Sequence, residues 1–189
     1  MKTIRTLLIA TVLLAGGSVS AKNLTIDTHK TEITWVGKKV GGQHSGTINL
    51  KNADLKTDAG AIISGVFVID MNSITDSDLS DAGMKQKLEG HLKSDDFFGV
   101  SKYPEAKLII TKKAPFKGNV AHVNADLTIK GITHPVEFDV TRDGKVYSAN
   151  ITVNRAKYNV RYGSGSFFDN LGDKVIYDDF EIGVKLITK

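Results

Sequence analysis

The chain has 189 residues, no cysteine, and 25 Lys and Arg residues against 21 Asp and Glu residues, which gives a formal net charge of +4. The absence of cysteine excludes disulfides, thiolate metal ligands and cysteine nucleophiles. Hydrophobic residues make up 41% of the chain and charged residues 24%, a balance typical of a globular protein rather than a disordered one. The basic residues are scattered among acidic ones, so we expect no nucleic-acid partner.

The N-terminus has the features of a secretory signal peptide. Two basic residues precede an apolar run from Leu7 to Ala15, and small residues follow as far as Ala21. This order is typical of a signal peptide cleaved after the small residues, whereas a transmembrane helix needs about 20 apolar residues. We therefore predict a cleaved signal peptide over residues 1–21 and one exported domain over residues 22–189.

Most of the remaining chain alternates between apolar and polar residues, which predicts β-strands. Two pairs between these runs, Lys130–Gly131 and Asp143–Gly144, are typical of tight hairpin turns. Short antiparallel strands with one apolar face indicate a β-sandwich or a closed barrel. The alternation is found at Ile33/Trp35, Leu108/Ile110, 123–129, 136–140, 147–153 and 180–186.

One segment departs from this alternation. Met84, Leu88 and Leu92 recur every four positions among polar residues, which predicts a short amphipathic helix near residues 78–92. Ser80 is the expected N-cap, with an acid in the first turn. We expect the helix to lie over the sheet or across one barrel opening, and we interpret its apolar side as packing rather than as a ligand lid.

No catalytic or metal-binding motif is present. None of the five histidines lies within four positions of another, so we expect no metal site. The string at 163–166 lacks the helix that follows a serine nucleophile, and the glycine-rich segment at 41–46 lacks the ending of a phosphate loop. We therefore expect neither a cofactor nor enzymatic activity.

Four strings in the chain resemble the YceI-like family of exported bacterial lipid-binding proteins. They are Gly42–Gly46, His91–Phe98 followed by Tyr103–Pro104, Asp126–Val136, and Asp179–Leu186. The resemblance implies an all-β fold, an extended lipocalin-like antiparallel barrel of eight strands, and a periplasmic location. It also implies an apolar interior that holds a long isoprenoid chain, such as a polyprenyl phosphate or an isoprenoid quinone.

These implications lead to two expectations about partners. The ligand is a long-chain isoprenoid lipid, and its exchange involves transient contact with a membrane. The protein itself acts as a monomer or a homodimer.

The later segment Asn154–Val160 keeps the arginine of the family pattern but has Lys157–Asn159 where relatives often carry an aspartate, an aromatic residue and a glycine.

The apolar faces of the predicted strands supply the candidate wall of a ligand tunnel. A barrel of eight strands is either filled by its own side chains or holds one slender ligand, so three functions stay open. The first is an isoprenoid carrier; the second is a stress-related barrel with a filled core that acts through surface contacts; the third is an enzyme acting on the bound lipid. The tunnel candidates are Ile33, Trp35, Phe67, Ile69, Leu108, Ile110, Leu127, Ile129, Phe138, Val140, Ile151, Val153, Phe180 and Ile182.

The candidates for a polar mouth are His44, His91, Arg155 and Arg161. An arginine suits a phosphate head group because its planar guanidinium donates two parallel hydrogen bonds, whereas a quinone needs only one or two neutral donors. We expect that replacement of Arg155 by alanine leaves the fold intact and weakens a phosphate-headed ligand more than a quinone.

Overall fold

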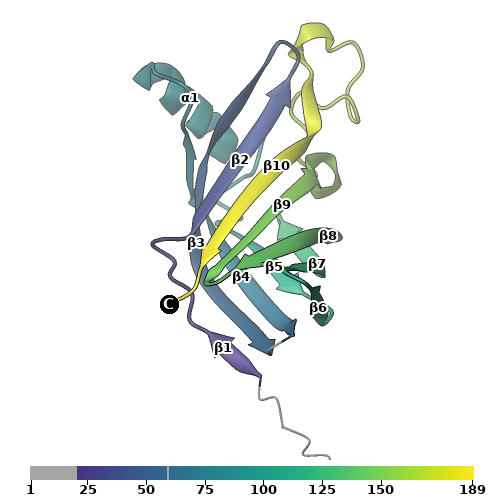
Figure 1. The fold of residues 1–189 in the computed structure, drawn as a ribbon. Helices are drawn as coiled ribbons and strands as arrows, with labels where there is room; N and C mark the ends of the chain where they lie inside the picture. The colour runs from purple at the N-terminus through teal and green to yellow at the C-terminus, as the bar shows by residue number, and fades with distance from the viewer. Residues whose placement is uncertain (1–20, 59) are drawn as a thin grey trace, which may run out of the picture.

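The computed structural model describes residues 21–58 and 60–189, so the predicted signal peptide lies, except for Ala21, outside the described residues. Eight antiparallel strands form the body of the protein (Figure 1). They are β2 (Glu32–Lys39), β3 (Gly42–Asp58), β4 (Ala61–Asp76), β5 (Glu105–Ile110), β7 (Val120–Ile129), β8 (Ile132–Asp143), β9 (Val146–Asn154) and β10 (Ile176–Ile187).

The pairing of β3 with β4 closes the sheet into a barrel. Around the barrel the strands follow the order β3, β2, β10, β9, β8, β7, β5, β4. Two short strands extend this sheet: β1 (Lys22–Leu24) pairs with β3, and β6 (Ala114–Lys117) pairs with β4 and β7. The predicted eight-stranded antiparallel barrel is confirmed.

The two predicted hairpin turns are present, one of them displaced by one residue. Lys130 and Gly131 join β7 to β8 with φ angles of 51° and 73°, the positive values that a two-residue hairpin turn requires. Between β8 and β9, Asp143 pairs with Val146 and belongs to the ladder. The turn therefore begins at Gly144, whose φ of 56° is easily adopted because glycine has no Cβ.

The predicted helix is α1 (Ala82–Lys93), which begins later than expected. Its N-cap is Asp81 rather than Ser80, because Asp81 Oδ1 accepts a hydrogen bond of 2.8 Å from Met84 N and so satisfies a free amide of the first turn. Met84 is 61% exposed, whereas Leu92 is buried. The helix thus contacts the barrel through its C-terminal part and projects beyond it.

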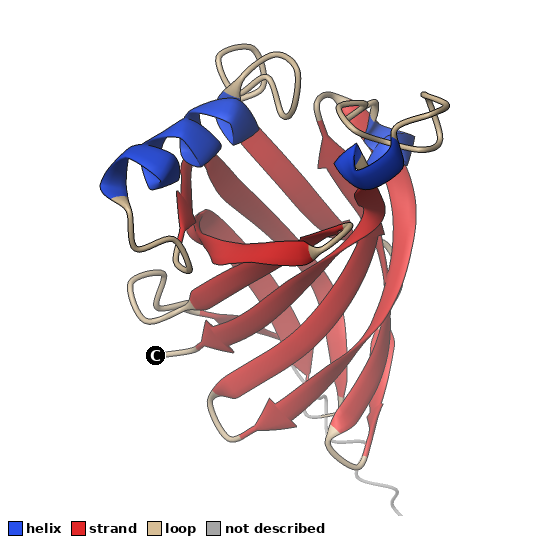
Figure 2. Cartoon of the chain, turned by 90° about the horizontal axis from the view of Figure 1, so that it is seen from above, coloured by secondary structure: helices blue, strands red, loops and turns tan. Residues whose placement is uncertain are grey.

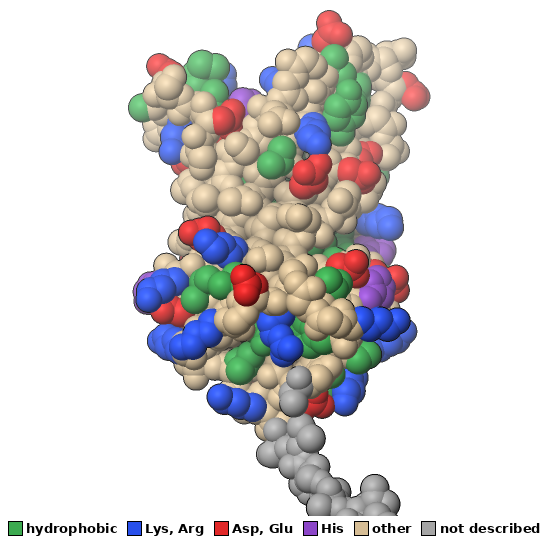
Figure 3. Space-filling view, viewed as in Figure 1, with side chains coloured by type: hydrophobic (Ala, Val, Ile, Leu, Met, Phe, Trp, Pro, Cys, Tyr) green, Lys and Arg blue, Asp and Glu red, His purple; other side chains and the backbone are tan. Residues whose placement is uncertain are grey.

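The two ends of the barrel differ. At one end, α1 lies on one side of the opening and the loop between β9 and β10 lies on the other (Figure 2); this loop includes the short 3-10 helices η1 (Arg155–Tyr158) and η2 (Gly172–Lys174). Figure 3 shows a notch between these projecting parts. We call this the helix end, and the opposite end, where β6 lies, the β6 end. Within the part of the chain that the structure describes, no helix has the length and apolarity to span a membrane.

The barrel wall between β8 and β9 is completed by η1. The two strands pair only from Val140 to Asp143 on β8, so they part toward the helix end. There, His134 Nε2 lies 3.0 Å from the Lys157 carbonyl oxygen, and the His134 ring meets the buried Tyr158 ring edge-on at 5.3 Å. Burial raises the pKa of Tyr158, so its hydroxyl stays neutral in this wall.

Arg155, the first residue of η1, holds the loop at the helix end. Its side chain is 3% exposed and donates four hydrogen bonds, to the carbonyl oxygens of Val160, Tyr162, Ile176 and Tyr177, at 2.8–3.2 Å. Asp178 Oδ1 lies 3.4 Å from Arg155 Nη2. Burial lowers the pKa of Arg155 and the nearby Asp178 opposes that effect, yet a guanidinium remains charged under such conditions.

We predict that Arg155→Met lowers the free energy of unfolding by about 3 kcal/mol, because it leaves one buried and three partly buried carbonyl groups without their donor and removes the cation beside Asp178. Urea unfolding followed by circular dichroism measures this change. Arg161→Met, in the same loop but on an exposed side chain, should change it by less than about 0.5 kcal/mol. Equal effects of the two variants would contradict the anchoring role.

Candidate functional site

The barrel encloses a cavity of about 240 Å³ that receives side chains from every barrel strand. A single water molecule needs roughly 10–15 Å³ of such space, so this cavity is far larger than a packing defect. The barrel interior is therefore hollow. The alternative of a core filled by its own side chains disagrees with this geometry.

The cavity wall is almost entirely apolar. Strand residues alternate between the two faces of a sheet, so the apolar positions of each alternating segment reach the interior together. Every predicted tunnel residue lies in the cavity wall. The contact of these residues with a ligand stays a prediction. The residues concerned are Ile33, Trp35, Phe67, Ile69, Leu108, Ile110, Leu127, Ile129, Phe138, Val140, Ile151, Val153, Phe180 and Ile182.

The helix contributes to the cavity in a way that we did not predict from the sequence. Leu92 at the end of α1 lines the cavity together with Phe97 and Phe98. These two rings meet edge-on at 5.0 Å, and Phe98 lies 6.5 Å from the Phe180 ring of β10. The last turn of α1 and the segment after it therefore close part of the cavity. The two adjacent phenylalanines after a helical pattern were the available signal.

The cavity is closed at the β6 end. Leu55, Ile62, Tyr147 and Leu186 line it there and are at most 7% exposed. Outside them, the Phe116 ring of β6 lies 6.5 Å from the Tyr147 ring. The Arg142 guanidinium lies over the Phe116 ring, with Cζ 4.3 Å from the ring centroid. These layers separate the cavity from solvent.

At the helix end the cavity reaches the surface. Tyr177 lines it and is 51% exposed, and Arg155 and Ile176 also belong to this part of the wall. The notch seen in Figure 3 lies at the same end. The site is therefore an apolar pocket with one closed and one accessible end.

The predicted polar residues are only partly brought together. Arg155 lies at the cavity wall, but its hydrogen bonds go to carbonyl oxygens of the loop and of the start of β10, so the expectation that its removal leaves the fold intact is revised. His91 is flanked by Phe97 at 5.6 Å and Tyr162 at 4.3 Å, and its Nε2 has no hydrogen-bond partner among the described residues. Arg161 is exposed and bonds Asn159 Oδ1 at 2.6 Å. A head-group contact stays a prediction for all of them.

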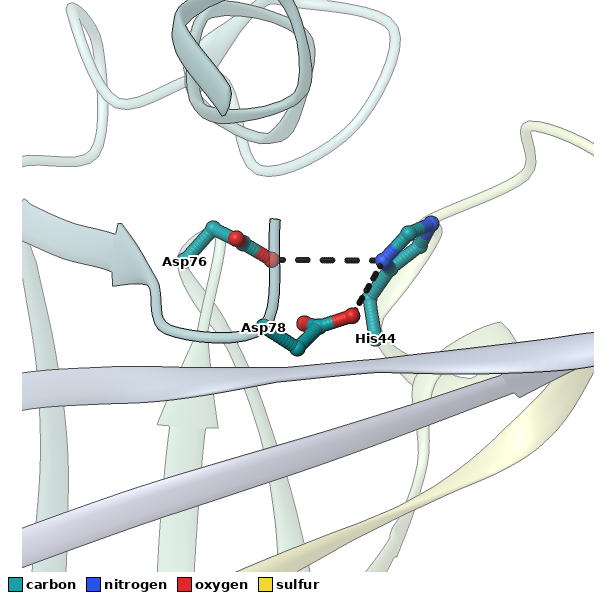
Figure 4. Close-up of side chains that lie close together, drawn as sticks. All are labelled: His44, Asp76 and Asp78. Carbon is teal, nitrogen blue, oxygen red and sulfur yellow. Dashed lines mark hydrogen bonds and ion pairs between the residues drawn. The ribbon is translucent and has the colours of Figure 1, made fainter. Parts of the chain in front are cut away.

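His44 lies apart from this group, in a cluster with two carboxylates (Figure 4). Its Nδ1 is 3.0 Å from Asp78 Oδ2 and 3.9 Å from Asp76 Oδ2. The hydrogen bond from Ser45 N to Asp78 is the largest cause that lowers the pKa of Asp78, and the contacts with Asp76 and His44 lower it further. None of the three lines the cavity.

Comparison with known proteins agrees with this architecture. The YceI-like domain matches residues 24–187. A UPF0312 protein of Pseudomonas fluorescens is 31% identical over 147 residues, which cover 76% of this chain and 74% of the relative.

Two solved structures share the fold. BcnA of Burkholderia cenocepacia superposes with a TM-score of 0.70 at 25% identity, and the match covers 87% of this chain and 99% of BcnA. A polyisoprenoid-binding domain from Saccharophagus degradans superposes with a TM-score of 0.59 at 16% identity, covering 87% of this chain and 97% of that domain. Because the YceI-like domain spans almost all of the described barrel, the chain belongs to the YceI-like family.

Proposed function

We propose that this protein is a periplasmic, non-enzymatic carrier that holds the isoprenoid tail of a lipid in the barrel cavity. The observation that carries the proposal is the apolar cavity, which every barrel strand lines and which is accessible at one end. The solved polyisoprenoid-binding domain with the same fold supports the choice of an isoprenoid, and the signal-peptide pattern at residues 1–21 supports export.

An isoprenoid fits this cavity because it needs no polar partner along its length. Each methylene group that it buries contributes about 0.8 kcal/mol, from which the cost of ordering the chain is subtracted. A polyprenyl phosphate and an isoprenoid quinone both carry such a tail. The closed β6 end requires that the tail enters first and that the head group stays at the helix end, near Tyr177.

The composition of the wall favours binding over catalysis. Among the described residues that line the cavity, the ionisable side chains are Arg155, Tyr147 and Tyr177. General acid–base catalysis uses a positioned group that exchanges a proton near neutral pH. The described lining residues include neither a carboxylate nor a histidine, so this part of the chain offers no such group in the wall.

The helix end also carries the side chains for membrane contact. Tyr162, Phe168 and Tyr177 are half-exposed, Phe167 is 37% exposed, and Met84 of α1 is 61% exposed. Aromatic side chains favour the interface between a membrane and water. We therefore assign lipid exchange with a membrane to this end.

Trp35, the one tryptophan of the chain, lines the cavity and reports on binding. We predict that ubiquinone quenches its fluorescence saturably, at about one quinone per chain. Leu108→Asn, which puts an amide into the apolar wall, should weaken this binding roughly tenfold or more. Lys107→Asn, on the adjacent outward position, is the matched control and should leave the affinity unchanged.

Circular dichroism establishes that both variants are folded before the titration. Undecaprenyl phosphate, added as a competitor, tests whether the two lipid classes share the cavity. Absence of quenching by ubiquinone in the wild-type protein, together with no lipid in organic extracts of the purified protein, would contradict the carrier proposal.

We further predict that Phe168→Ser slows the transfer of ubiquinone from vesicles to the protein by several-fold, because it removes an aromatic contact with the membrane. Equilibrium affinity should stay unchanged, since Phe168 does not line the cavity. Stopped-flow quenching of Trp35 measures the rate. Val120→Ser, an exposed apolar residue on β7 next to β6, is the control, and an equal slowing by both variants would contradict the assignment of the helix end.

A further inference from the structure

The His44 cluster is assembled from two neighbouring strands and the loop that leads to α1 (Figure 4). His44 lies on β3, Asp76 is the last residue of β4, and Asp78 follows it by two positions. The pairing of Gly46 with Asp76 aligns these strands, and Ser77 N donates to the Ser45 carbonyl oxygen at 2.9 Å. One nitrogen and two carboxylate oxygens thereby lie within 4.8 Å of one another.

Backbone amides fix the orientation of both carboxylates. Leu79 N donates to Asp76 Oδ1 at 2.8 Å, and Ser45 N donates to Asp78 Oδ1 at 2.8 Å. Each aspartate is thus held by one oxygen, and its other oxygen points toward His44 Nδ1. Supporting hydrogen bonds of this kind orient the ligands of metal sites.

One oxygen of the cluster is left without a partner. The Asp76 side chain is fully buried, and its Oδ2 accepts no hydrogen bond from the described residues. His44 Nδ1 carries at most one proton, and its nearer carboxylate oxygen is Asp78 Oδ2 at 3.0 Å rather than Asp76 Oδ2 at 3.9 Å. A buried carboxylate oxygen without a donor is costly, so this arrangement favours a bound positive charge.

We propose that His44 Nδ1, Asp76 Oδ2 and Asp78 Oδ2 bind a divalent transition-metal cation of the Zn²⁺ type. Zinc binds histidine nitrogen and carboxylate oxygen at about 2.0–2.2 Å, which places the ligand atoms of a tetrahedral site roughly 3.3 Å apart. The two separations from His44 Nδ1, 3.0 and 3.9 Å, lie on either side of this value, and all three ligand atoms lie within 4.8 Å of one another. The imidazole ligand selects such a metal over Mg²⁺ and Ca²⁺, which prefer oxygen alone.

The position of the site connects the cation to the helix. Asp76 N donates to Glu89 Oε1 of α1 at 2.9 Å, and Asp76 Oδ1 holds Leu79 just before the N-cap Asp81. A cation bound to His44, Asp76 and Asp78 would therefore link β3 and β4 to the loop that precedes α1. The site stands independently of the lipid proposal, because none of its ligands lines the cavity.

The test uses the purified protein after treatment with a chelator, and zinc as the probe. Isothermal titration calorimetry should show one Zn²⁺ per chain and no heat with Mg²⁺. Thermal unfolding should move upward by about 5–10 °C when free zinc is a hundredfold above its dissociation constant. Asp76→Asn, which keeps the acceptor for Leu79 N, should unfold without zinc at a temperature no lower than the wild type and should lose the zinc-dependent rise.

Two further variants make the result unambiguous. His44→Gln, at a half-buried position, should weaken zinc binding by more than the roughly 10–100-fold that loss of a supporting hydrogen bond costs. His122→Gln is the matched control, because His122 also contacts two carboxylates, Asp139 and Glu137, but on an exposed surface. A wild-type protein that binds no zinc, or equal loss of affinity in His122→Gln and His44→Gln, would overturn the proposal.

Discussion

The structure of this protein depends on a closed, hydrogen-bonded barrel wall. The apolar side chains on its inner face do not fill the space inside the barrel. The pairing of β3 with β4 completes a ring of eight strands, and the number and tilt of the strands set the diameter of a barrel. The inner side chains therefore cannot collapse onto each other as they do in a packed core. They lack the dispersion contacts that a filled core provides, and a linear hydrocarbon in the cavity restores those contacts.

Arg155, a charged residue of the cavity wall, is bonded to the protein itself. Its guanidinium donates to four carbonyl groups, those of Val160 and Tyr162 in its own loop and those of Ile176 and Tyr177 at the start of β10. Water enters a cavity only where polar partners are available to hold it. A wall that presents almost no free donors or acceptors stays dry, so a hydrocarbon entering it displaces little bound water. The hydrogen bonds of Arg155 thus anchor the loop and also leave its guanidinium with few free donors for water in the cavity.

Much of this architecture could be predicted from the sequence, because strand periodicity is a local signal. Residues such as Ile151 and Phe180 alternate with polar neighbours, and the same alternation places them in the cavity wall. The role of Arg155 could not be predicted, since its acceptors lie up to 22 residues away and meet it only in the folded loop. The helix start was misplaced because Ser80 and Asp81 are both good N-caps, and only the Asp81 side chain reaches Met84 N.

The His44 cluster shows why spacing along the chain is a poor guide to sites built across strands. Metal motifs on a helix or in a short loop repeat at fixed intervals, whereas 32 positions separate His44 from Asp76 and only the β3–β4 register brings them together. The same residue, Asp76, holds Glu89 of α1 through its backbone amide. The last turn of α1 in turn supplies Leu92 to the cavity. Helix α1 therefore contacts the His44 cluster through Glu89 and lines the cavity through Leu92. A change in the position of α1 relative to β4 would alter both contacts.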